Sequence, residues 1–178
     1  MKTFLVFLKK EFLGGLRNKK LLICLILFAL IGMLSPFTAK IMPDLMASMV
    51  PESIQITIAD PTSIDAWLQF YSNIGTIGLL VFVILFTDTI SAEISHGTFI
   101  QLITKGLPKT TIVLAKACYL SILWSLSFLL SASVSAFYTM IYFHDDSAVQ
   151  VPSALVSYWL FGLLAISILL LGSSFAKS

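Results

Sequence analysis

Four long apolar runs alternate with more polar stretches along the chain. The apolar runs cover residues 21–38, 71–90, 112–143 and 154–175. Each is long enough for a helix through a hydrocarbon core of roughly 30 Å, since a helix rises by about 1.5 Å per residue. Backbone groups in lipid have to bond within their own segment, and no run alternates as a barrel strand would. The pattern therefore predicts four spanning helices, of which the third is long enough to tilt or to project beyond the bilayer.

The twenty residues before the first run predict a different element, a helix that lies in the membrane interface. One side of its helical wheel is apolar and carries Phe4, Leu5, Leu8, Phe12 and Leu16. Another side is basic and carries Lys2, Lys9, Lys10 and Arg17. Such a helix buries its apolar face among acyl chains and turns its basic face toward anionic headgroups. Gly14–Gly15 would permit a sharp turn into the first span. A simple basic topology anchor is the alternative.

Composition makes lipid the expected environment of the whole chain. Of its 178 residues, 58% are hydrophobic and only 11% are charged, and the mean hydropathy is +0.97. A soluble domain carries about 25% charged residues, so this chain cannot cover a globule of its size with polar surface. We predict an all-α fold class: a polytopic transmembrane helical protein with an N-terminal amphipathic interfacial helix and four membrane spans. The net charge of only +2 gives no argument for nucleic acid as a partner.

The distribution of charge predicts the orientation of the spans. Every lysine and arginine except Lys40 lies before the first run, between the second and third runs or at their border, or after the fourth run. The opposite side instead holds the acidic residues Asp44, Glu52, Asp60, Asp65, Asp145 and Asp146. The positive-inside rule then places both ends and the 91–111 connection in the cytoplasm, with 39–70 and 144–153 outside the cell membrane. An aromatic belt at the outer interface is expected from Trp67, Tyr71, Tyr142, Tyr158 and Trp159.

The outer stretch 39–70 contains two candidate short elements. The segment "SIQITIAD" at 53–60 alternates and could form a strand. The segment "SIDAWLQFYSN" at 63–73 begins like a helix with Ser63 as its cap. An ordered cap over the spans and a plain linker are both compatible with this pattern.

The 91–111 connection is too polar for lipid and still carries helix-forming residues. Glu93 to Thr104 can form a short helix, and Gly106–Leu107–Pro108 breaks it, with Pro108 suited to the first turn of the next helix. A short cytoplasmic helix with modest apolar side chains and few charges suits the groove of a partner protein. An ordinary re-entry turn that packs on its own spans is the alternative.

Charged residues flank this connection on both sides. Asp88 and Glu93 lie at the inner end of the second span, and Lys109 and Lys116 lie at the start of the third. We expect these groups to pair at the level of the headgroups, where Lys116 could also snorkel. A proton relay through Asp88 is the alternative interpretation.

Together these residues resemble a known family, the bacterial ABC-2 type transporter permeases. Those proteins begin with an amphipathic elbow helix and carry a cytoplasmic coupling helix between spans two and three. The coupling helix has a pattern of Glu, then Gly-Thr, a Leu/Ile-rich segment, a Pro with a basic residue, and a basic residue entering span three. Here the pattern corresponds to Glu93, Gly97–Thr98, "FIQLITKGL", Pro108–Lys109 and Lys116. The resemblance extends over the whole chain in order.

The resemblance implies a transport function. The coupling helix would dock on a separately encoded ATP-hydrolysing subunit, and the chain would act as one permease subunit of a homo- or heterodimer. The residues implied to contact the ATPase are Glu93, Gly97, Thr98, Gln101, Thr104, Pro108 and Lys109. The family typically has six spans where this sequence predicts four, so a fragment, a truncated gene product and a four-span protein of another kind are all open.

Small polar residues form a stripe on the third run. Ser127, Ser131 and Ser135 recur at every fourth residue. Small residues at this spacing let helices approach closely, so packing within the chain or in a dimer is one interpretation. A polar stripe that lines a substrate path is the other.

Several kinds of chemistry find no support in the sequence. No G-x-x-x-x-G-K-[ST] loop for ATP, no H-E-x-x-H and no G-x-S-x-G motif occurs. Cys24 and Cys118 lie in apolar runs without a second ligand at metal spacing. We therefore expect no catalytic site, cofactor or metal in this chain. A cleavable signal peptide is also not favoured, because six of the eleven basic residues precede residue 21 and Pro36–Phe37 spoils a small-residue cleavage site.

Two other functions compete with the permease prediction. One is a non-transporting membrane assembly or immunity factor that binds a cytosolic partner through residues 92–116. The other is a small ion-coupled carrier, which would depend on a pH gradient and lose this dependence in Asp88→Asn. No span carries a charge at mid-membrane, which argues against the carrier.

Overall fold

The computed structural model describes residues 2–49, 60–87, 104, 108–144 and 151–175. In these ranges every regular element is helical and no strand occurs. The elements are α1 (Lys2–Arg17), α2 (Lys20–Met49), α3 (Ser63–Asn73), the π-helical turn η1 (Ile74–Gly78), α4 (Leu79–Phe86), α7 (Lys109–Tyr142) and α8 (Val151–Phe175). Four of these stretches are long and apolar enough to cross a membrane, and α3, η1 and α4 together form one of them. The predicted all-α fold with four spans is confirmed.

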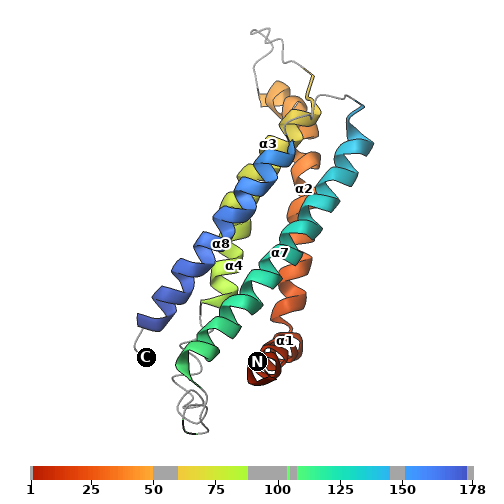
Figure 1. The fold of residues 1–178 in the computed structure, drawn as a ribbon. Coiled ribbons are helices and arrows are strands. Elements are labelled where there is room, and N and C mark those ends of the chain that lie inside the picture. Colours follow the sequence, from red (N-terminus) through yellow and green to blue (C-terminus); the bar gives the residue numbers. More distant parts are fainter. Residues whose placement is uncertain (1, 50–59, 88–103, 105–107, 145–150, 176–178) are drawn as a thin grey trace.

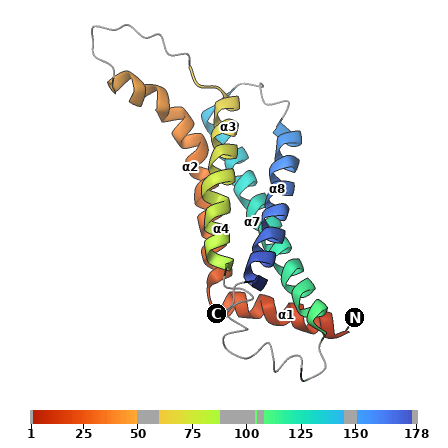
Figure 2. The same ribbon diagram turned by 90° about the vertical axis from the view of Figure 1, so that its left-hand side faces the viewer.

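The four spanning stretches run side by side, and α1 lies across one end of them. Figure 1 shows the end of α4, the start of α7 and the end of α8 at the same end as α1. The view turned by 90° shows α1 close to perpendicular to the spans (Figure 2). This is the direction expected of a helix in the plane of a membrane interface. We call this end of the bundle the α1 end.

Helix α2 is longer than the apolar run that predicts it, because it continues through Pro36 and Pro43 to Met49. Proline removes a backbone donor and kinks a helix, and the last part of α2 leans away from α3 in Figure 2. Lys40 helps to hold this part against α7. Its ammonium lies 3.4 Å from the backbone carbonyl oxygen of Tyr142 and 5.1 Å from the centroid of the aromatic ring of Tyr142.

The stretch 39–70 differs from the predicted outer loop. Residues 39–49 are the last part of α2, and residues 63–70 are the first part of α3. The loop prediction was wrong for residues 39–49, because prolines and charges indicate exposure to water, whereas a helix can continue into water once its start is packed. The helix predicted at 63–73 is confirmed as α3. The predicted strand at 53–60 lies outside the described residues except for Asp60, which is not in a strand.

The cap of α3 lies one residue before the predicted one. Thr62 is the N-cap residue, and Ser63 is the first residue of the helix. The Asp65 carboxylate accepts hydrogen bonds of 2.9 Å from both the backbone nitrogen and the hydroxyl of Thr62. Together with the contact of the Asp65 backbone N–H with the Thr62 side chain, the first of these bonds forms a capping box, which satisfies backbone donors that a helix start leaves free.

Aromatic side chains fill the middle of the bundle. Phe28 of α2, Phe82 of α4 and Trp124 of α7 meet edge to face, with ring centroids 5.4 to 6.5 Å apart. Tyr71 and Tyr158, which we placed in an aromatic belt, stack on each other at 4.9 Å. These two rings therefore join α3 to α8.

The predicted serine stripe of α7 lies in the contact with α2. Ser127, Ser131 and Ser135 are all fully buried within this single chain. The Ser127 hydroxyl lies 3.5 Å from the Cys24 sulfur of α2. One turn further along, a Cβ on Gly32 would overlap the carbonyl oxygen of Ser131, so the two backbones nearly touch. This burial supports the packing interpretation of the stripe.

Candidate functional site: the elbow junction

At the α1 end, one stripe of α1 packs on one stripe of α7. The α1 residues are spaced by three or four positions, which places them on one face of the helix; they are Phe4, Phe7, Glu11 and Gly15. The α7 residues lie at positions i, i+3, i+4 and i+7 of its first three turns, which also share one face, and are Ile112, Ala115, Lys116 and Tyr119. We call these eight residues the elbow junction.

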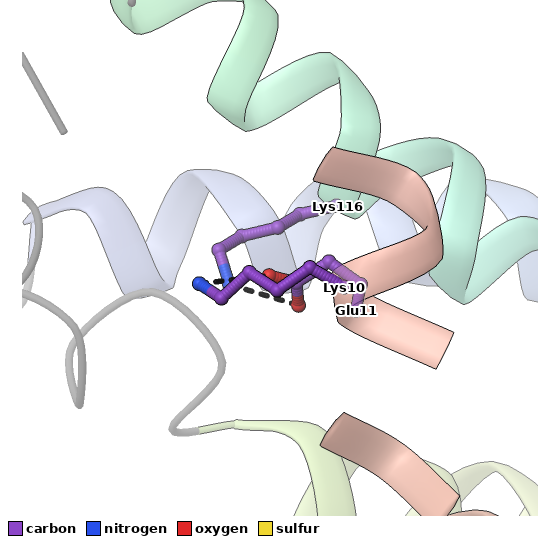
Figure 3. Close-up of polar contacts among 3 residues, drawn as sticks. All are labelled: Lys10, Glu11 and Lys116. Carbon is purple, nitrogen blue, oxygen red and sulfur yellow. Dashed lines mark hydrogen bonds and ion pairs between the residues drawn. The ribbon is translucent and has the colours of Figure 1, made fainter. Parts of the chain in front are cut away.

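A buried ion pair lies at the centre of the elbow junction. The Lys116 ammonium is 3.2 Å from one carboxylate oxygen of Glu11, and the exposed fractions of the two side chains are 2% and 11%. Lys10, which is half exposed, approaches the other carboxylate oxygen at 3.7 Å. Figure 3 shows the two ammonium groups converging on the single carboxylate from α7 and α1. The pair thus ties two helices that are 105 residues apart in the sequence.

This ion pair adds little to the free energy of folding, but it defines the register in which α1 docks on α7. At 3.2 Å, an effective dielectric constant of about 20 gives an attraction on the order of 5 kcal/mol. Removing each ion from water costs several kcal/mol, which offsets most of that gain. Separating the two partners while both stay buried would be costly, however, so α1 cannot slide along α7 freely.

Apolar contacts surround the ion pair on both sides. The buried Phe7 ring packs on Ile112 and Ala115, and Phe4 packs against the same group. On the other side, the Phe12 ring meets Tyr119 edge to face at 5.0 Å. These contacts exclude water from the carboxylate and the ammonium and thereby strengthen their interaction.

Gly15 allows the close approach of α1 to Tyr119. A Cβ at residue 15 would overlap the Tyr119 hydroxyl, whereas a Cβ at Gly14 would meet nothing within 4 Å. The Tyr119 hydroxyl is buried and has no hydrogen-bond partner among the described residues. The two neighbouring glycines therefore form a matched pair for testing the junction.

We expect Gly15→Ala and Gly14→Ala to act in opposite directions on stability. Alanine favours a helix over glycine by up to about 1 kcal/mol, so Gly14→Ala should raise the apparent melting temperature of the detergent-solubilised chain. Gly15→Ala should lower it, since displacing the buried Tyr119 ring costs roughly 1–3 kcal/mol. Adding Tyr119→Phe should restore part of the loss, because the phenyl ring lacks the obstructing oxygen. Equal shifts in both single variants would contradict the close contact.

The turn from α1 into α2 corrects one prediction from the sequence. Gly14–Gly15 does not form the turn, because both residues lie inside α1. The chain turns at Asn18–Lys19, where Lys19 has a left-handed backbone with φ of 58°. The last turn of α1 closes with hydrogen bonds from Asn18 to the Gly14 carbonyl at 2.9 Å and from Lys19 to the Leu16 carbonyl at 3.1 Å. Glycine is needed at residue 15 for packing rather than for turning.

Some apolar residues of α1 pack on the protein, and others are exposed. We predicted that Phe4, Leu8 and Phe12 enter the acyl chains, but these three side chains pack against the buried core of the protein. Leu5 and Leu16 of the same predicted face are exposed. The basic residues Lys9, Lys10 and Arg17 are exposed as well. The surface left for lipid is therefore narrower than the whole predicted apolar face.

The predicted coupling segment is described only in part. Glu93, Gly97, Thr98 and Gln101 lie outside the described residues, as does Asp88. Of the remaining predicted contacts, Thr104 is exposed, and Pro108 is the exposed N-cap residue of α7. Helix α7 begins at Lys109, two residues before the predicted end of the connection.

Sequence reasoning missed Glu11 as a partner of Lys116. Our expected partners for this lysine were Asp88 and Glu93, and neither is among the described residues. A signal for Glu11 does exist in the sequence, because it is the sole carboxylate before Asp44 and stands in a basic helix. If the face of α1 that carries this lone carboxylate is buried, the carboxylate needs a cationic partner from another helix.

The elbow junction is suited to a mechanical role. Within the described residues no group of three His, Cys, Asp or Glu side chains could hold a metal ion. The junction instead contacts three elements, since α1 packs on α7 and α2, and α2 packs along α7. The start of α7 is therefore in direct contact with α1, and both helices are in contact with α2.

These features define an integral membrane protein of the polytopic α-helical class. The family described as "ABC-2 family transporter protein" matches residues 5–178, and the chain therefore belongs to the ABC-2 transporter family. It is 22% identical over 180 residues to the uncharacterized transmembrane protein YxlG of Bacillus subtilis (strain 168), an alignment that covers 100% of this chain and 70% of that relative. No solved structure matches the chain.

Membership of the family confirms the resemblance noted in the sequence. It gives the chain a permease-type role in the membrane and implies association with an ABC ATPase. It also indicates that ATP hydrolysis belongs to the associated ATPase rather than to this chain.

Proposed function

We propose that the chain is the membrane-spanning permease subunit of an ATP-driven ABC-2 exporter in the cell membrane. A second permease subunit, identical or related, would complete the pathway, and two ATPase subunits would drive it. The α1 end faces the cytoplasm in this proposal, because the basic residues gather there. Residues 91–111 then form the contact with the ATPase.

The observation that carries the proposal is the position of the elbow junction directly after that connection. Pro108 caps α7, and its carbonyl accepts the first hydrogen bond of the helix from Thr111 at 3.0 Å. The buried residues that bind α1 begin at Ile112. A force applied at Pro108 therefore reaches the elbow junction within about two turns of helix, because α7 is continuous from Lys109 through Lys116.

Specific residues have specific roles in this proposal. The residues that contact the ATPase are Glu93, Gly97, Thr98, Gln101, Thr104, Pro108 and Lys109. The exposed basic residues of α1 hold the helix at anionic headgroups while its junction with α7 transmits the movement. In this proposal the permease positions the contact and transmits the movement through rigid helices, and ATP hydrolysis in the partner subunit supplies the free energy for transport.

The first test is purification of the tagged, full-length protein in mild detergent, followed by mass spectrometry of the proteins that co-purify. We expect a stoichiometric subunit with an ATP-binding G-x-x-x-x-G-K-[ST] loop. An intact complex that lacks any such subunit would overturn the proposal and favour a membrane assembly or immunity factor.

Two substitutions then test the contact itself. Gly97→Pro and Glu93→Ala should reduce co-purification of the ATPase, or separate ATP hydrolysis from transport, while the amount of protein in the membrane stays unchanged. Asp44→Ala is the matched control, because Asp44 is an exposed carboxylate on α2 far from the α1 end. Normal binding and normal coupling in both Gly97→Pro and Glu93→Ala would count against residues 91–111 as the dock.

A further inference from the structure

A groove lies at the end of the bundle opposite α1. It has a volume of about 500 Å³ and is formed by the last part of α2 and the start of α3. Its apolar wall consists mainly of Met42 and Met46 of α2 and Leu68 of α3. The groove lies beside the last part of α2, which leans away from α3 (Figure 2), and Pro43 of α2 also lines it. Ligand sites in proteins have volumes of roughly 300–1,000 Å³, so the groove has the size of a small-molecule site.

Polar groups in the groove are hydrogen-bond acceptors and negative charges. Asp60, Asp65 and Gln69 line it together with the apolar wall. The Gln69 amide nitrogen already donates to Asn73 at 3.3 Å. Asp65 uses one carboxylate oxygen in the cap of α3, and a carboxylate can accept at about four sites. Both carboxylates therefore remain able to attract a cation.

The nearby lysine does not neutralise these carboxylates. Lys40 is the sole lysine or arginine between Lys20 and Lys105 in the sequence. Its ammonium is directed to α7, where it contacts the carbonyl and the ring of Tyr142. Lys40 is not among the residues that line the groove. Among the described residues, the lining thus contains two negative charges and no positive one.

The groove lies at the depth where a membrane changes from apolar to polar. Counted from Lys20 at the α1 end, residue 40 is about 30 Å along α2 at roughly 1.5 Å per residue, which equals the thickness of a hydrocarbon core. The groove begins at Ala39 on α2, so it starts near the boundary of the opposite leaflet. A molecule that rests at this boundary with an apolar body and a charged group reaches the groove without leaving the membrane surface.

We infer that this groove binds amphipathic organic cations. The apolar body of the ligand packs on Met42, Met46 and Leu68, and its positive charge lies beside Asp60 and Asp65. As a ligand class for the proposed permease, the inference rests on the proposed function, but the binding itself requires no ATPase. Loss of binding and loss of ATPase coupling can therefore be observed separately.

Binding is tested with two ions of equal apolar bulk and opposite charge, tetraphenylphosphonium and tetraphenylborate. The full-length protein is placed in phosphatidylcholine nanodiscs, and each ion is measured by equilibrium dialysis against empty nanodiscs of the same lipid. We expect saturable binding of one tetraphenylphosphonium per chain above the lipid background, and none of tetraphenylborate. Equal binding of both ions would show an apolar or lipid site and overturn the inference, as would no saturable binding of the cation.

Substitutions locate the binding in the groove. Asp60→Asn and Asp65→Asn should each weaken tetraphenylphosphonium binding by roughly threefold, the size expected for one exposed charge. Asparagine at residue 65 keeps an acceptor for the cap of α3. Asp44→Asn is the control, because it removes an exposed carboxylate of α2 that does not line the groove. Equal affinities in all three variants would place the cation elsewhere.

A charge placed in the apolar wall gives a second, stronger readout. Met42→Lys should abolish saturable binding of the cation through repulsion and loss of apolar contact. Leu45→Lys, on a neighbouring exposed position of α2 outside the groove, should leave binding within about twofold of the original chain. Unchanged melting temperatures in both variants show that the difference is not one of folding. Retained binding in Met42→Lys would overturn the assignment.

Discussion

Glu11→Ala should destabilise the protein by about 3–5 kcal/mol, the cost of leaving one partner of a buried ion pair behind. The variant removes the carboxylate that lies 3.2 Å from the Lys116 ammonium, whose side chain is 2% exposed. Desolvation of that ammonium is then no longer offset by the opposite charge on α1. For a chain of this size, 1 kcal/mol corresponds to roughly 2–4 °C, so the expected loss is on the order of 10 °C in the apparent melting temperature.

Two further variants separate the ion pair from general effects on α1. Lys10→Ala removes the other cation near Glu11, but its side chain is 52% exposed. Exposed pairs contribute about 1 kcal/mol or less, so this control should shift the melting temperature by only a few degrees. The double variant Glu11→Met with Lys116→Met should recover most of the loss, because an apolar pair needs no compensation. If Glu11→Ala were no more harmful than Lys10→Ala, the ion pair would not hold the junction.

Gly32→Ala should destabilise the protein by about 1–3 kcal/mol, although alanine is the better helix former. The added Cβ would overlap the carbonyl oxygen of Ser131, a backbone atom that cannot rotate away. Helices α2 and α7 would have to separate, and this would loosen the contacts of the buried serines on α7. Thermal unfolding followed by tryptophan fluorescence measures the loss.

Gly172→Ala is the matched control for this substitution. A Cβ at residue 172 of α8 meets nothing within 4 Å, so the same chemical change occurs in a spanning helix without a close neighbour. We expect unchanged or slightly higher stability in Gly172→Ala, since only the higher helix propensity of alanine then affects the free energy of unfolding. A result in which both variants are equally stable would refute the close approach of α2 and α7.

The sequence was sufficient to predict the spans, because lipid imposes a minimum length on every apolar run. It was insufficient for the far end of α2. Lys40, Pro43 and Asp44 indicate water, and hydropathy cannot distinguish a helix that continues into water from a loop. The neighbours that support the helix there, such as Tyr142, are distant in the sequence.

The elbow junction could be predicted only in part for a related reason. Spacing shows that Phe4, Phe7 and Glu11 share one face of a helix, but it does not show which helix receives that face. Lys116 was recognised as a cation in an apolar run, and its described partner proved to lie 105 residues earlier. Contacts between helices depend on side-chain shape, as between Gly15 and Tyr119, and this information is not contained in periodicity.

The distance along the chain between the two partners of the ion pair has a consequence for synthesis. Glu11 leaves the ribosome long before Lys116, since 105 residues separate them. Until the third span enters the bilayer, α1 lacks its contacts with α7 and is held at the membrane by its contacts with α2 and by lipid contacts such as those available to Leu5 and Leu16. The ion pair between α1 and α7 can therefore form only after the third span has been inserted with Lys116 on the same side of the membrane as Glu11. An inverted third span would carry Lys116 to the opposite surface and leave Glu11 without it, so α1 could not dock on α7 through this ion pair.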